Sequence, residues 1–113
     1  MNISELAKDW SGENGRDNFK KAKDQAPSWD DHEAVIKELR EEAKVVRAKL
    51  KEATSDLNSV NNAIAFEALN GLLTEEKLES LGKYRENAQK SEHTHHRELY
   101  YIKEAIRTVT ASW

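Results

Sequence analysis

A regular spacing of apolar residues dominates the middle of the chain. Counting from Ile36 in alternating steps of three and four residues meets an apolar side chain at every stop as far as Ile64. Charged residues of both signs fill the positions between, so the pattern is typical of the packing stripe of a coiled coil. We call these positions the first stripe: Ile36, Leu39, Ala43, Val46, Leu50, Ala53, Leu57, Val60 and Ile64.

The residues that flank the first stripe carry helix-end signals. Pro27-Ser28 precedes Asp31 by three residues, a pattern related to the capping box, so the helix is expected to begin near residue 28. Asn70-Gly71 supplies the glycine that commonly ends a helix. Residues 54–62 include poor helix formers, which allows a kink or a break there. The stripe keeps its phase through them, and we therefore expect one continuous helix over about 28–70.

A second long helix is expected after a turn at about 70–74. Thr74 followed by Glu75 and Glu76 predicts its start, because a threonine caps the first amides and acidic residues there complement the helix dipole. The helix is expected to run over about 75–109. Its apolar pattern is sparser, and we call it the second stripe: Leu78, Leu81, Ala88, His95, Leu99, Ile102, Ile106 and Val109.

The short connection between the two helices predicts an antiparallel hairpin. Pairing residues whose numbers add to about 144 sets small side chains against large ones, with Ala88 facing Leu57 and Ala43 facing Ile102. The sequence therefore predicts an all-α fold, a coiled-coil-like hairpin over residues 28–113.

Residues 1–27 form a separate N-terminal arm in this interpretation. Ser4 is expected to cap a short helix that ends near Trp10, and Asp17 to open a second short helix that contains Phe19. The apolar residues of the arm are too few for a core of their own. We therefore expect the arm to pack on the hairpin, to be mobile, or to be ordered by a partner.

Composition and charge narrow the function. The length of 113 residues is that of one domain. Hydrophobic residues make up 37% of the chain and charged residues 35%, and the mean hydropathy is −0.91. This composition is more typical of a helical hairpin than of a compact globule. The net charge of −3 leaves no segment basic enough to bind nucleic acid. The chain has no cysteine, no apolar run of the ~18–20 residues that a membrane span needs, and no secretory signal pattern at its start. We expect a cytoplasmic protein that binds neither nucleic acid nor membrane.

One cluster of residues suggests metal chemistry. Glu92, His93 and His96 lie on nearly one side of the predicted helix and are a candidate zinc site. The chain has no His-Glu-x-x-His motif and offers no fourth ligand nearby, so a solvated face is the preferred interpretation. No serine has a nucleophile-elbow context either. We expect no enzyme activity, no cofactor and no small-molecule substrate.

The apolar residues exceed what one hairpin can bury. The consecutive residues 99–102 span more than one helix face, so at least one must point away from the first helix. Further apolar residues stand near the turn, and Trp29 and Trp113 near the open end. Such surplus predicts a homodimer or a protein partner. The expected interface comprises Leu99, Tyr100, Tyr101 and Ile106 on the second helix, with Phe66, Leu72 and Leu73 around the turn.

Two resemblances to known families suggest what the expected protein binding is for. Trp10-Ser11-Gly12 matches Trp-x-Gly, and Tyr100 with Glu104 matches Tyr-x-x-x-Glu. Both are features of the WXG100-type secreted helical hairpins, which the chain resembles in these motifs. In that family Trp-x-Gly occupies the turn between the helices, whereas the predicted turn here is at residues 69–71.

The chain also resembles, in overall build, the small bacterial anti-activators that sequester LuxR-type quorum-sensing regulators. Size, mild acidity, the long hairpin pattern and the surplus apolar residues of the second helix carry this resemblance. It implies a helical inhibitor that binds a transcriptional regulator. A WXG100-like secreted hairpin, a secretion chaperone, a phage-encoded adaptor or connector and a metal-binding module remain the alternatives.

Overall fold

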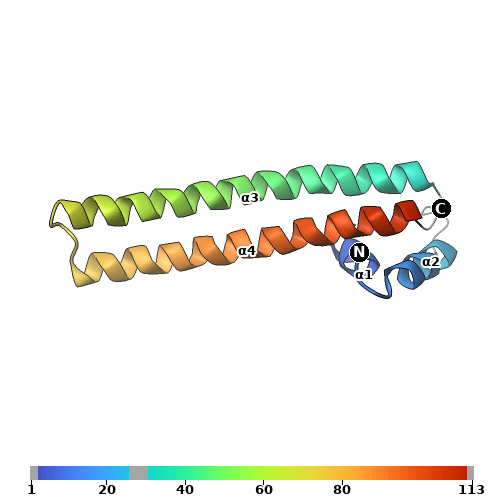
Figure 1. The fold of residues 1–113 in the computed structure, drawn as a ribbon, viewed down its shortest axis with the longest axis horizontal. Coiled ribbons are helices and arrows are strands. Elements are labelled where there is room, and N and C mark those ends of the chain that lie inside the picture. The colour runs from blue at the N-terminus through green and yellow to red at the C-terminus, as the bar shows by residue number, and fades with distance from the viewer. Residues whose placement is uncertain (1–2, 26–30, 112–113) are drawn as a thin grey trace. The chain divides into compact units, whose positions relative to one another are not determined.

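The computed structural model describes residues 3–25 and 31–111, and every regular element in these ranges is a helix (Figure 1). The elements are α1 (Ile3–Trp10), α2 (Gly15–Gln25), α3 (His32–Leu69) and α4 (Glu75–Ala111). The two long helices pack as a hairpin, which confirms the predicted all-α architecture. Helix α3 is unbroken through residues 54–62, as the phase of the first stripe predicted.

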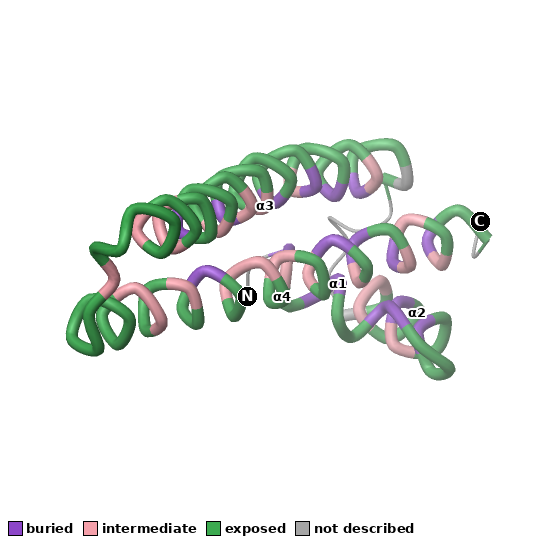
Figure 2. Tube along the Cα trace, turned by 60° about the vertical axis from the view of Figure 1, so that its left-hand side comes forward, coloured by how far each residue is buried: buried purple, intermediate pink, exposed green. Residues whose placement is uncertain are grey.

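The chain divides into two compact units. Met1–Arg47 and Arg97–Trp113 form what we call the base unit, which holds α1, α2, the start of α3 and the end of α4. Ala48–His96 forms the tip unit, which holds the turn and the adjoining parts of α3 and α4. In Figure 2 the buried positions are frequent in the base unit, while the chain around the turn is mostly exposed.

The arm helices supply part of the core of the base unit. Helix α1 buries one face, at spacings of three and four residues, through Ile3, Leu6, Ala7 and Trp10. The Trp10 ring meets the fully buried Phe19 ring of α2 edge to face, with ring centroids 4.9 Å apart. The arm therefore packs within the base unit, which was one of the three expectations for it.

Two contacts tie the arm to the long helices of the base unit. The Ser4 hydroxyl donates a hydrogen bond to the Glu42 carboxylate of α3 at 2.7 Å. At the start of α2, a Cβ on Gly15 would lie 3.3 Å from the Thr108 hydroxyl of α4 and would collide with the Trp10 carbonyl. The backbone between α1 and α2 thus approaches α4 closely, at a position that has room only for glycine.

The tip unit packs along both stripes with a thinner core. Ala53, Val60 and Ala88 are buried, whereas Leu50, Leu57, Ile64, Leu81 and His95 are half-buried. The Thr54 hydroxyl donates to the Glu92 carboxylate at 2.9 Å, and Lys77 Nζ lies 3.3 Å from Glu67 Oε2. The residue numbers in each pair add to within two of 144, so the predicted register is confirmed in this unit.

The start of α3 differs in detail from the expectation. Asp31 is the cap itself, because its carboxylate accepts the Ala34 amide at 3.2 Å, and the helix begins at His32. The expected start at Ser28, with Pro27 and Trp29, lies outside the described residues, as does Trp113.

The arm helices also begin earlier than expected. Ser4 lies inside α1, so its predicted capping role is wrong; its side chain bonds to Glu42 instead. Helix α2 begins at Gly15 and not at Asp17. Within the described ranges, no helix has an apolar stretch long enough to cross a membrane.

Candidate interaction surface

Large apolar side chains gather in the open around the turn between α3 and α4. Phe66 is 63% exposed, Leu69 87%, Leu72 51% and Leu78 45%. They come from the last turn of α3, the connection and the first turn of α4, and we call these four residues the tip patch. Single exposed apolar residues are ordinary, whereas several large ones exposed around one turn make that turn a candidate interaction surface. Phe66 and Leu72 were predicted there, and the predicted Leu73 is half-buried.

The turn that carries the tip patch is held by backbone hydrogen bonds. Gly71 has a φ of 66°, and its amide donates to the Ala68 carbonyl at 3.2 Å. The Leu72 amide donates to the Glu67 carbonyl at 2.9 Å, which completes a Schellman motif at the end of α3. The Asn70 side-chain amide adds a bond to the Phe66 carbonyl at 2.8 Å.

The start of α4 is fixed in the same way. Thr74 Oγ1 accepts the Lys77 amide at 3.1 Å, as its predicted capping role requires. The ion pair between Lys77 and Glu67 joins the two helices across the turn. The backbone that carries the tip patch is therefore held by hydrogen bonds on both sides of the turn and by one ion pair.

Acidic side chains border the tip patch. Between residues 66 and 79 the chain carries four carboxylates, from Glu67, Glu75, Glu76 and Glu79, against the single ammonium of Lys77. Lys77 is engaged by Glu67, and Lys83 of the next turn lies 3.8 Å from Glu79. Glu75 and Glu76 form no ion pair with a described residue, and both lie in the first turn of α4. A hollow of about 650 Å³ is lined by Glu67, Thr74, Glu76, Lys77, Ser80 and Leu81.

The predicted interface at the end of α4 is only partly exposed. Tyr100 is 60% exposed, and its ring meets that of Tyr101 edge to face, with centroids 5.9 Å apart. Tyr101 and Ile106 are half-buried. Leu99 is 9% exposed, because it lies on the second stripe and packs inside the base unit. Tyr100 therefore contributes most of the surface that this region offers to a partner.

The candidate metal ligands do not assemble into a site. Glu92 accepts the Thr54 hydroxyl, and His93 and His96 are exposed on α4. Throughout the part of the chain that the structure describes, no three histidine, aspartate or glutamate side chains gather closely enough to hold a metal ion.

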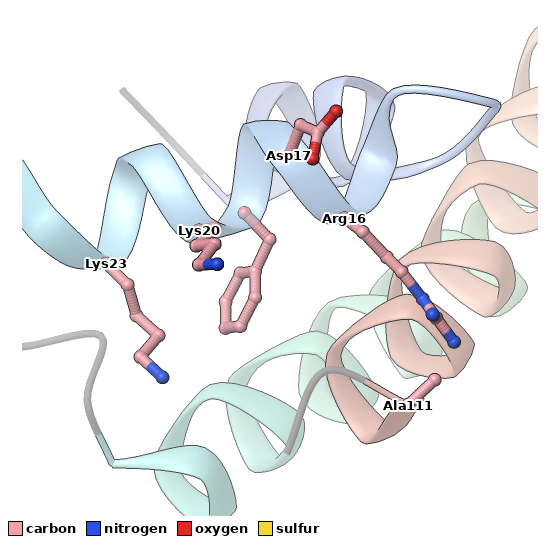
Figure 3. A pocket seen from close by; sticks show the side chains of 6 residues that line it. Arg16, Asp17, Lys20, Lys23 and Ala111 are labelled. Carbon is pink, nitrogen blue, oxygen red and sulfur yellow. The ribbon is translucent and has the colours of Figure 1, made fainter.

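A basic hollow on α2 was not predicted from the sequence. Arg16, Lys20 and Lys23 follow one another at spacings of four and three residues, the helical repeat that could have indicated a shared face. In Figure 3 the Arg16 side chain extends toward Ala111 of α4, while Asp17 points away from it. The hollow has a volume of about 380 Å³ and is lined by Arg16, Asp17, Phe19, Lys20, Lys23 and Ala111.

The motif residues of the WXG100 resemblance lie in the base unit. Trp10 is the last residue of α1, and Gly12 takes a φ of 87° in the connection to α2. The Trp-x-Gly motif thus stands at a turn between two short helices and not at the turn of the hairpin. Tyr100 and Glu104 lie one turn apart on α4, where Glu104 also pairs with Arg107 at 3.5 Å.

Comparison with protein-family models, curated proteins and solved structures finds no match to this chain. Both resemblances therefore stay predictions.

Proposed function

We propose that this chain is a non-enzymatic helical module that binds another protein and inhibits it by sequestration, as an anti-activator does with a transcriptional regulator. The observation that carries the proposal is the tip patch, the four apolar side chains held in the open by a hydrogen-bonded turn. Covering such side chains contributes roughly 25 cal/mol for each Å² of apolar surface removed from water.

The side chains of the tip patch favour binding over catalysis. Leucine and phenylalanine carry no titratable or nucleophilic group, so they supply binding free energy and no general acid, base or nucleophile. The turn is also organised in advance by the bonds of Gly71 and Leu72, which lowers the conformational entropy lost when a partner binds.

Site-specific photocrosslinking in cells that express the chain naturally tests the proposal. A photoreactive residue at position 69 is expected to capture one protein in stoichiometric amount, because Leu69 is the most exposed residue of the tip patch. The double variant Phe66→Ser/Leu69→Ser should lose that protein when it is captured through a distant affinity tag. Placing the same photoreactive residue at exposed Lys49 in the tip unit is the control.

A crosslinked protein that is captured equally by the wild type and the double variant would contradict a role for the tip patch. If the captured protein is a transcriptional activator, adding the purified chain should reduce its binding to DNA. An undiminished DNA complex would exclude inhibition by sequestration.

A further inference from the structure

We infer that the tip patch receives a basic amphipathic helix of its protein partner. This inference rests on the proposed function and adds the chemistry of the partner segment. It is drawn from the apolar side chains of the tip patch together with the acidic residues that border them.

The arrangement of the apolar side chains suits a helical segment. Phe66 and Leu69 are spaced by three residues on α3, and Leu72 in the connection and Leu78 in the first turn of α4 are exposed as well. A helix that presents apolar residues at i, i+3, i+4 and i+7 covers a surface of this kind with a single stripe. An extended strand would need an open sheet edge, and all regular elements of the described ranges are helices.

The border of the tip patch specifies the charge of that helix. Residues 66–79 carry four carboxylates and one ammonium, which gives this short segment a net charge of −3. The whole chain has the same net charge. The cations in reach, Lys77 and Lys83, are engaged by Glu67 and Glu79, which leaves the charges of Glu75 and Glu76 to face outward. Lysine or arginine residues flanking the apolar stripe of the partner would complement them.

A second copy of the chain is a poor occupant. Two tip patches brought together would bring the Glu75 and Glu76 carboxylates of both copies to one interface, which is unfavourable. Helix α2 does offer Arg16, Lys20 and Lys23, but its aromatic residue Phe19 is fully buried and offers no apolar surface. An anionic membrane surface would repel the same carboxylates. A basic helix from another protein satisfies both the apolar and the charged parts of the surface.

Peptide titration tests the inference with a defined probe. The probe is a synthetic amphipathic helix of leucine and lysine, and its matched control replaces every lysine with glutamate. We expect the lysine peptide to bind the full chain with one-to-one stoichiometry and the glutamate peptide at least about tenfold more weakly. Fluorescence anisotropy of labelled peptide at physiological salt gives both affinities.

Two double variants separate the apolar from the charged contribution. Phe66→Ser/Leu69→Ser should lower the affinity for the lysine peptide at least about tenfold. Glu75→Lys/Glu76→Lys should lower that affinity similarly and raise the affinity for the glutamate peptide. The charge-matched control is Glu38→Lys/Glu41→Lys, which changes two exposed glutamates in the base unit. It should leave binding of the lysine peptide to the tip patch in place.

The outcomes distinguish this inference from the proposed function. If Glu75→Lys/Glu76→Lys has no more effect than the control while Phe66→Ser/Leu69→Ser abolishes binding, the basic helix is excluded and protein binding at the tip patch stands. If neither double variant weakens binding of the lysine peptide, the tip patch is not the binding surface and both proposals fail. Self-association in sedimentation, or flotation with anionic or zwitterionic vesicles, that is lost in Phe66→Ser/Leu69→Ser would replace the basic helix by a second copy or a membrane.

Discussion

The glycines of this chain show how one residue type meets different local demands. Gly71 adopts a φ of 66°, where a Cβ is strained, because the Schellman turn requires a left-handed residue at this point. Gly15 has no space for a Cβ beside the Trp10 carbonyl. Gly82 differs from both, since a Cβ there would meet nothing within 4 Å and the residue lies inside α4.

Alanine at these positions should change stability in opposite directions. Gly82→Ala is expected to raise the free energy of unfolding by about 0.4–1 kcal/mol, because alanine loses less backbone entropy in a helix than glycine does. Gly71→Ala is expected to lower it by about 1–2 kcal/mol through the strained left-handed conformation. Urea denaturation followed by circular dichroism measures both values. A shift of the same sign in the two variants would contradict the assigned turn geometry.

Residue-level prediction succeeded where one side chain had one available role. Thr74 stands directly before two glutamates and caps α4 as predicted. The start of α3 was expected near Ser28, with Asp31 as its capping-box partner, whereas the hydrogen bond from the Ala34 amide makes Asp31 the cap. Local sequence does not decide between two capable caps, because each can close a helix at its own position.

At the scale of elements, the two long helices follow directly from their apolar periodicity. All nine positions of the first stripe are buried or half-buried, since a heptad repeat dictates which face meets the partner helix. The short arm helices were predicted as helices, but packing on the hairpin was only one of three expectations for them. A helix as short as α1 gives too brief a pattern to specify where its apolar face docks, and its Trp10 contact with Phe19 appears only in the structure.

Two leucines of α3 test this description. Leu39 is fully buried in the base unit, whereas Leu69 is 87% exposed at the tip. Leu39→Ala should lower the free energy of unfolding by about 2–5 kcal/mol, through lost burial and a cavity. Leu69→Ala should change it by no more than about 0.5 kcal/mol. Thermal or urea unfolding of the two variants provides the comparison, and similar losses in both would mean that Leu69 packs internally in solution.

At the scale of the molecule, the surplus of apolar residues has two different explanations. At the end of α4, burial extends beyond one stripe to Ala105, and the nearby start of α2 approaches Thr108 closely. The base unit therefore buries or half-buries most of the apolar residues at the end of α4 that were predicted to contact a partner. At the turn, the tip unit has no such covering among the described residues, and Phe66 and Leu69 stay exposed. Sequence counts reveal a surplus of apolar residues, but only the fold tells which part is already covered.

Tyr100 is the remaining exposed anchor of the interface expected at the end of α4, and its role in a homodimer or a target complex stays a prediction. An exposed tyrosine brings apolar area and a hydrogen-bonding tip, so it is a common interface residue. Tyr100→Ser/Tyr101→Ser should raise the dissociation constant of that association about tenfold or more while leaving the helicity nearly intact. Half-buried Tyr101 adds a stability cost, so the single variant Tyr100→Ser isolates the surface effect.

Tyr84 supplies the matched control, since it is 61% exposed on the same helix but lies in the tip unit. Tyr84→Ser should leave the association unchanged if the surface around Tyr100 is responsible. Light scattering across a range of concentrations reports self-association, and capture of the target reports binding to another protein. A wild type that is monomeric at every concentration, with target capture equal in all three variants, would show that Tyr100 is an ordinary exposed tyrosine and that the end of α4 is no interface.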